Sequence, residues 1–191
     1  SDGVDVDSYY TDPAFTTLYA AVLNITQNTG FASVVEAVAA AHAGDTLVVD
    51  AGTYTETGQL VVDKDLTITG AGAEQVTINP VYTSSGGSYA PENGWIAVAE
   101  DVTLSLSGVT IDGAGQSIKM AVISRGTVDI DGCVIQNISS GQYLGWGVCI
   151  LNGTNSVVQN SEFYNIQRIG VHVRGNVAAA TPEALIENCL F

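Results

Sequence analysis

The sequence predicts an all-β protein: a parallel β-helix of three sheets, with a short helix capping its N-terminal end. Short β-rich runs recur in groups of three, with Gly, Asn, Asp or Ser between them, as in a coil whose every rung contains three strands. The composition agrees with this fold, because a chain of 191 residues that is 46% hydrophobic and 13% charged can bury one substantial core.

The helix is predicted in the stretch SVVEAVAAAHAGD at residues 33–45. Ser33 and Glu36 form a capping box that starts it, and Gly44 is its expected C-terminal cap. His42 is expected in the last turn, where a cation complements the helix dipole. We therefore divide the chain into an N-terminal arm of unknown structure at 1–30 and a capped β-helix at 31–191.

Five blocks of the chain repeat one plan of runs and turns, at residues 60–78, 95–113, 120–137, 147–165 and 170–191. Side chains alternate between the two faces of a strand, so every second residue of a run points inward. In the second run, Leu104 and Leu106 align with Val128 and Ile130. The third run places these residues in inward columns: Val109, Ile111, Cys133, Ile135, Ser161, Phe163, Cys189 and Phe191.

The turn before the third run has the same chemistry in four rungs, which carry Gly108, Gly132, Asn160 and Asn188 there. Gly and Asn tolerate left-handed backbone angles, and stacked Asn side chains can hydrogen-bond along the coil. The stacking also separates the cysteines. Cys133 and Cys189 lie two rungs apart, about 9.6 Å by strand spacing, and Cys149 lies on another sheet, so we predict three free thiols.

The segment ASVVEAVAAAHAGDTLVVDAGTYTE at 32–56 resembles the entry segment of the pectin-lyase-like right-handed parallel β-helix superfamily, and LVVDKDLTITGAG at 60–72 continues the resemblance. The resemblance covers roughly residues 31–191 and implies the right-handed coil. It does not choose a function, because the superfamily includes pectate lyases, polygalacturonases, phage tailspikes, adhesins and non-catalytic surface proteins.

In enzymes of that superfamily the reactive groups project from the first sheet of each rung. The first-sheet runs here, WIAVA, MAVIS, GVCIL and GVHVR, contain no carboxylate, whereas glycoside hydrolysis needs a pair of them. The polygalacturonase signatures are absent as well, so we assign no catalytic residue. The alternative is a polysaccharide lyase or glycoside hydrolase whose catalytic rungs lie beyond residue 191.

Alternation predicts which first-sheet side chains point outward. One column is expected to hold Ala97, Val122, Cys149 and His172, and the next Ala99, Ser124, Leu151 and Arg174. His172 and Arg174 then stand on an exposed strand face, where they could contact a carboxylate of a partner or glycan.

Two loops, at 79–95 and 139–147, bring five aromatic residues towards this first sheet: Tyr82, Tyr89, Trp95, Tyr143 and Trp146. Aromatic faces with polar edges can stack on a sugar and hydrogen-bond it. We take these five, with His172 and Arg174, as candidate carbohydrate or partner contacts. Two alternatives stay open: the aromatics pin their own loops to the coil, or the small-residue sheet docks a protein.

The net charge of the chain limits which classes of molecule it can bind. Twenty acidic residues against five basic give a net charge of −15, which makes a nucleic-acid partner improbable. No apolar run reaches the length of a membrane span. Ca²⁺ is the one candidate cofactor, through Asp50, Asp63, Asp101 or the stretch DGVDVD at 2–7, but turn-capping explains these residues better and no metal ligand is assigned.

Three tripeptides fit the N-glycosylation pattern, at Asn24, Asn137 and Asn152. The last run ends at IENCLF with no capping helix, so an open C-terminal end is expected, either continued by further rungs or paired with another chain. The resulting expectation is an extracellular or cell-surface β-helix with a structural, adhesive or assembly-forming role. A carbohydrate-binding module that uses the aromatic loops is the other alternative.

Overall fold

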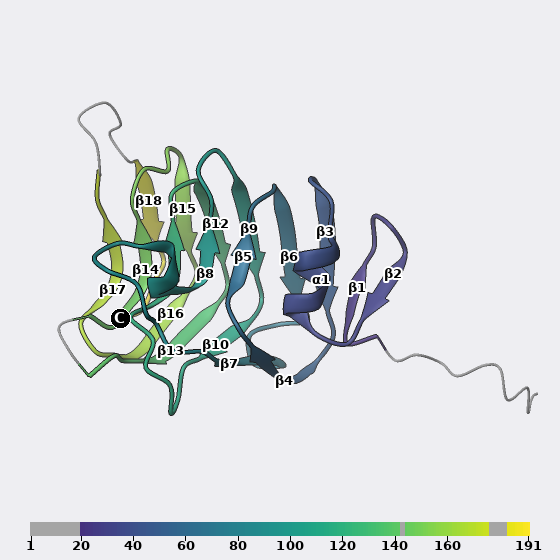
Figure 1. The fold of residues 1–191 in the computed structure, drawn as a ribbon, viewed down its shortest axis with the longest axis horizontal. Helices are drawn as coiled ribbons and strands as arrows, with labels where there is room; N and C mark the ends of the chain where they lie inside the picture. Colours follow the sequence, from purple (N-terminus) through teal and green to yellow (C-terminus); the bar gives the residue numbers. More distant parts are fainter. Residues whose placement is uncertain (1–19, 142–143, 176–182) are drawn as a thin grey trace, which may run out of the picture.

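The computed structural model describes residues 20–141, 144–175 and 183–191. The described chain winds through three parallel sheets, A, B and C, and adds one strand to each per rung (Figure 1). Sheets B and C have five strands each, so the coil has five complete rungs. The predicted three-sheet parallel β-helix is confirmed.

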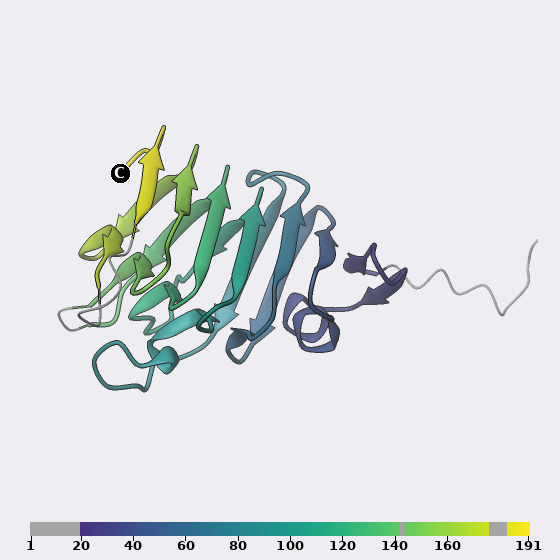
Figure 2. The same ribbon diagram turned by 90° about the horizontal axis from the view of Figure 1, so that it is seen from above.

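The rungs stack along the long axis of the molecule, and Figure 2 shows the successive strands side by side. Sheet A contains β1 (Val22–Asn24), β2 (Thr29–Phe31), β3 (Asp45–Val49), β6 (Leu66–Gly70), β9 (Thr103–Ser107), β12 (Thr127–Asp131), β15 (Ser156–Gln159) and β18 (Ala184–Glu187). Sheet B contains β4 (Gly52–Thr57), β7 (Val76–Val81), β10 (Thr110–Asp112), β13 (Val134–Ile138) and β16 (Glu162–Ile166). Sheet C contains β5 (Leu60–Val62), β8 (Gly94–Val98), β11 (Met120–Ser124), β14 (Trp146–Ile150) and β17 (Ile169–Val173).

The core columns of sheets A and B have the predicted register. Leu104 pairs with Val128 and Leu106 pairs with Ile130, and all four side chains are buried. At the C-terminal end of the column in sheet B, the rings of Phe163 and Phe191 stack with centroids 5.0 Å apart. Apolar side chains are thus removed from water in every rung, and this burial is the main source of stability in a coil.

The predicted left-handed turn is also present. Gly108, Gly132, Asn160 and Asn188 have φ values of 63°, 58°, 50° and 52°. Asn188 donates to Asn160 Oδ1 at 3.3 Å, and Asn160 donates to Asp131 Oδ1 at 2.8 Å. The amides therefore form the expected ladder along the coil.

The capping helix α1 (Val34–Ala40) is shorter than predicted. Ser33 caps it by accepting from the Glu36 N–H at 3.1 Å, but the chain is already extended at Ala41. His42 therefore lies beyond the helix, and its predicted role at the helix dipole is wrong. Its backbone N–H instead donates to Asp45 Oδ2 at 2.7 Å, which fixes the entry into β3.

A buried carboxylate that the sequence did not single out joins this helix to the first rung. Glu56, on β4, is only 1% exposed and accepts from the backbone N–H groups of Val34 and Val35, at 2.7 and 3.1 Å. These donors have no partner inside the helix, so the carboxylate satisfies them and complements the positive end of the helix.

Residues 20–31, most of which fall in the arm of unknown structure, contain a hairpin. Strand β1 pairs antiparallel with β2 on one side and with β3 on the other, with Val22 opposite Val49. The hairpin and α1 lie together at the N-terminal end of the coil (Figure 1) and cover the edge of its first rung. Residues 1–19 lie outside the described part.

At the opposite end, β18 pairs with β15 on one side only. Leu185, Leu190 and Phe191 are 52%, 52% and 67% exposed there. The open end is therefore apolar in the described chain, and its pairing with further rungs or with another chain stays a prediction.

Candidate functional site

The outer face of sheet C carries a second, smaller apolar cluster separate from the core, formed by Ala97, Met120, Ile123, Trp146, Cys149 and Leu151. The strand register places one column of side chains on this face, with Val61, Ala97, Ile123, Cys149 and His172 in successive rungs. This face differs from the usual polar outside of a coil, because most of it is buried.

The predicted register of β11 is wrong by one residue. Val122 was expected in the outward column, but it pairs with Ile96 and Val148 and belongs to the core, whereas Ile123 pairs with Ala97 and Cys149. Arg125, and not Ser124, belongs to the next outward column, which also holds Ala99. Its backbone N–H donates to the Val98 carbonyl of the preceding rung. The equivalent N–H groups of Leu151 and Arg174 bond the rungs that precede them. All five residues of β11 are buried, Ser124 included, so the run has no alternation of buried and exposed side chains that could set its register.

Three aromatic rings meet on this face. The Trp146 and His172 rings stack with centroids 4.4 Å apart, and Tyr89 lies 5.8 Å from Trp146 and 6.3 Å from His172. Arg174 extends over the Tyr89 ring, with its Cζ 4.6 Å from the centroid, and its Nη1 donates to the Tyr89 hydroxyl. The fold therefore brings four of the seven candidate contact residues together: Tyr89, Trp146, His172 and Arg174.

These rings border a pocket of about 260 Å³, lined by Ser88, Tyr89, Met120, Leu144, Trp146, Arg168, Ile169 and His172. Trp146 and His172, which line the pocket, each have a buried ring nitrogen, Nε1 and Nε2, with no hydrogen-bond partner in the described chain. Buried polar groups are normally satisfied, because leaving one unpaired costs about 1–3 kcal/mol. Such atoms at a pocket indicate a site that a ligand or ordered water completes.

Four of the five cations of the chain surround this face. Lys119 and Arg125 directly precede and follow β11, and Arg168 and Arg174 do the same for β17. Lys119 donates to the Gly86 carbonyl at 2.7 Å, and Arg125 and Arg174 donate to Tyr89. These three cations therefore bond neutral acceptors in a chain rich in carboxylates. Their spacing around two first-sheet runs was visible in the sequence but was not used.

Burial and the neighbouring arginines set the protonation states of His172 and Cys149. Burial lowers the pKa of His172, and the positive charges of Arg174 and Arg168 lower it further, so the imidazole is neutral near pH 7. Burial raises the pKa of the Cys149 thiol to about 12, although Arg174 opposes the shift, so this thiol is not a nucleophile.

Comparison with known proteins identifies the family. A family model described as "Protein of unknown function (DUF1565)" matches residues 23–187. The chain belongs to the DUF1565 family. The match runs from within β1 to the end of β18, so it includes all the residues of the sheet C site. No curated protein and no solved structure matches the chain.

Two other candidate contacts of the DUF1565 chain, Trp95 and Tyr82, do not join the site. Trp95 is fully buried in the core and donates to the Gly58 carbonyl at 3.1 Å. Tyr82 packs against the core and donates to the Glu92 carbonyl at 2.7 Å, so both residues pin the loop, as the alternative held. Tyr143 lies outside the described residues.

The three sequon asparagines have different surroundings. Asn24 is 1% exposed, donates to Asp45 Oδ2 at 2.8 Å and caps the N–H groups of Thr26 and Gln27, so a glycan has no access to it in this fold. Asn137 is half-buried in a second ladder, between Asp112 and Asn165. Asn152 is half-buried just after β14.

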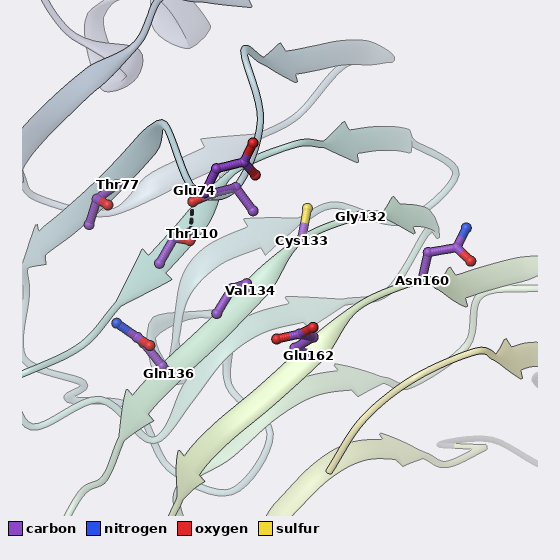
Figure 3. Close-up of a pocket in the computed structure, with 10 residues that line it drawn as sticks. Glu74, Thr77, Thr110, Gly132, Cys133, Val134, Gln136, Asn160 and Glu162 are labelled. Atoms are coloured by element: carbon purple, nitrogen blue, oxygen red, sulfur yellow. Dashed lines mark hydrogen bonds between the residues drawn. The ribbon is translucent and has the colours of Figure 1, made fainter.

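A larger groove, of about 550 Å³, crosses sheet B (Figure 3). Two of its polar side chains already have partners: Thr110 donates to the Ala73 carbonyl, and Gln136 donates to the Asp112 carboxylate. Glu74 and Glu162 line it three rungs apart, about 14 Å by strand spacing. That separation exceeds the two-carboxylate geometry of glycosidases.

The candidate Ca²⁺ ligands do not converge. The described residues contain no group of three or more His, Cys, Asp or Glu that could hold a metal ion, and residues 2–7 lie outside them. Asp63 pairs with Lys64 at 3.0 Å. The three cysteines are free, as predicted. No helix of the described chain is long and apolar enough to cross a membrane.

Proposed function

We propose that this DUF1565 chain is an extracellular, adhesive β-helix that binds an anionic glycan at the sheet C pocket. The observation that carries the proposal is the pair of buried ring nitrogens without a partner in the described chain, Trp146 Nε1 and His172 Nε2, on two residues that line the pocket. Arg174 lies beside it, over the ring of the lining residue Tyr89. The indole nitrogen can only donate, and the neutral imidazole can present its N–H. A ligand rich in acceptors is the natural complement.

The shape of the pocket supports a sugar as the ligand. The Trp146 and His172 rings offer flat apolar faces, and polar groups stand at their edges, which is the combination that carbohydrate sites use. Cations gathered on one face of a chain with a net charge of −15 support an anionic sugar over a neutral one. A guanidinium such as Arg174 suits a carboxylate or sulfate group.

Binding without catalysis is the form of the proposal that the residues favour. The five strands of sheet C contain no Asp or Glu, so they offer no carboxylate pair around a bound sugar. Neither the neutral His172 nor the protonated Cys149 is an activated nucleophile. Release of reducing or unsaturated sugar products would support the enzyme alternative instead.

The test is binding of a panel of neutral, uronate-containing and sulfated oligosaccharides, measured by calorimetry. Trp146→Ala and Arg174→Gln should each weaken binding of the acidic members at least about tenfold, the effect of losing roughly 1.4 kcal/mol. Tyr164→Ala and Lys64→Gln are matched controls, because Tyr164 is exposed on sheet B and Lys64 already pairs with Asp63. Equal losses in the controls, or no binding by any acidic member, would contradict the proposal.

A further inference from the structure

The turn that carries Tyr89 over the sheet C pocket has an unfavourable backbone conformation. The Ala90 N–H donates to the Gly87 carbonyl at 3.2 Å, which closes a turn over 87–90 with Tyr89 at its third position. Tyr89 has a φ of +56°. That position of a turn favours Gly or Asn when φ is positive, and a bulky aromatic residue is rarely found there.

Two arginines hold Tyr89 in this conformation. Arg125 Nη2 donates to the Tyr89 carbonyl at 2.9 Å, and Arg174 bonds the phenol and lies over its ring. The ring also covers the pocket, since it packs against Trp146. The Tyr89 hydroxyl therefore already accepts from Arg174, the guanidinium that an anionic ligand would need.

We propose that the 87–90 turn is an autoinhibitory gate, in which Tyr89 takes the place of the ligand on Arg174 until an anion displaces it. The identity of the displacing ligand rests on the proposed function, but the opening of the turn does not. The gate makes Arg174 a shared group, bound either to the phenol or to the ligand.

The anchors of the loop define what moves. Lys119 donates to the Gly86 carbonyl, and the fully buried Asn93 donates to the Gly87 carbonyl, so both glycines stay fixed. Between these anchors, loss of the bond from Ala90 to Gly87 lets Tyr89 change from positive to negative φ and relieves its unfavourable backbone angle. This opening of the turn withdraws the Tyr89 carbonyl from Arg125 and the ring from the pocket.

The two states are balanced by opposing contributions. The closed turn gains the two arginine contacts and the ring packing, and it bears the strain of a left-handed tyrosine. A ligand that takes over Arg174 removes one of these contacts, so the remaining strain favours the open turn. Only this difference in interaction between the two states allows a ligand to shift the equilibrium.

Acrylamide quenching of tryptophan fluorescence tests the gate without any ligand. Trp146 is 4% exposed and Trp95 is fully buried, so the native chain should be quenched weakly. Tyr89→Gly removes the ring and gives the fully open reference. Arg174→Gln and Arg125→Gln keep the ring but release it, and each should raise quenching at least about threefold towards that reference, as expected for a shifted two-state equilibrium. Tyr164→Phe, an exposed change on sheet B away from this loop, should match the wild type.

Stopped-flow binding of tetragalacturonate gives a second, separate measurement. A gate predicts that the observed rate reaches a plateau as the concentration rises, and that Arg125→Gln raises the plateau because Arg125 holds only the closed turn. Quenching at the wild-type level in both arginine variants would overturn the gate, whatever the glycan result. If quenching rises in both arginine variants but tetragalacturonate does not bind, the gate is supported and this oligosaccharide is rejected as its ligand.

Discussion

The imidazole of His172 stacks on the indole of Trp146, with ring centroids 4.4 Å apart and an interplanar angle of 24°. Trp146 begins β14 and His172 lies within β17, and the two rings meet because these strands are neighbours in sheet C. Each also carries a buried nitrogen without a partner in the described chain. The pair makes this face the candidate site and gives His172 a measurable effect on stability.

We expect His172 to make the stability of the fold depend on pH. Its pKa is lowered in the folded chain, mainly by burial, so below about pH 6.5 the unfolded chain binds the proton more readily. Stability is therefore full above that pH and falls as the pH drops towards the folded pKa. Urea unfolding of wild type and His172→Gln between about pH 7 and pH 5 should show a smaller decrease for the variant. An unchanged decrease would mean that His172 titrates normally.

The buried carboxylate of Glu56 should be important for the N-terminal cap. Glu56→Ala leaves the Val34 and Val35 N–H groups unpaired, and we expect a loss of about 1–3 kcal/mol in the free energy of unfolding. Glu56→Gln keeps one acceptor and should cost less. Glu36→Gln, an exposed change in the same helix, is the control, and chemical denaturation measures all three.

The Asn ladder separates backbone strain from hydrogen bonding. Asn160→Gly keeps the left-handed turn but loses the bonds to Asp131 and Asn188, whereas Asn160→Ala loses both the bonds and the backbone preference. The alanine variant should be less stable than the glycine variant by about 1–2 kcal/mol in urea unfolding. Equal stabilities would show that the left-handed angle is not what selects Asn at this turn.

The thiols should differ sharply in reactivity. Burial raises the pKa of Cys133 to about 11 and that of Cys149 to about 12, and both side chains are inaccessible, whereas Cys189 is half-buried near the open end. Labelling of the native chain with a thiol reagent at pH 8 should modify Cys189 first, and all three thiols should react in urea. Rapid native labelling of Cys149, located by peptide mapping, would contradict the closed sheet C face.

The fold could be predicted wherever the sequence carries two independent signals. Leu104 and Val128 lie in runs that alternate apolar and polar residues, and the Gly or Asn of the following turn fixes where the next run begins. In β11 both signals fail, because its residues are buried on both faces, and the predicted register slipped by one residue. The helix end was also misplaced, since Ala-rich sequence continues past Ala40, while the chain turns where the His42 N–H donates to the Asp45 carboxylate.

The sequence by itself determined the coil, its three sheets, the left-handed turns and the free cysteines, because stacking repeats the same local rules in every rung. It also supplied the aromatic and cationic residues, but not which of them meet. Only the tertiary structure decided that Trp95 is part of the core and that Tyr89 is clamped by Arg125 and Arg174 above Trp146. The physical reason is that a loop's direction depends on the groups that satisfy its backbone, here Lys119 and Arg125, and those partners come from distant positions in the chain.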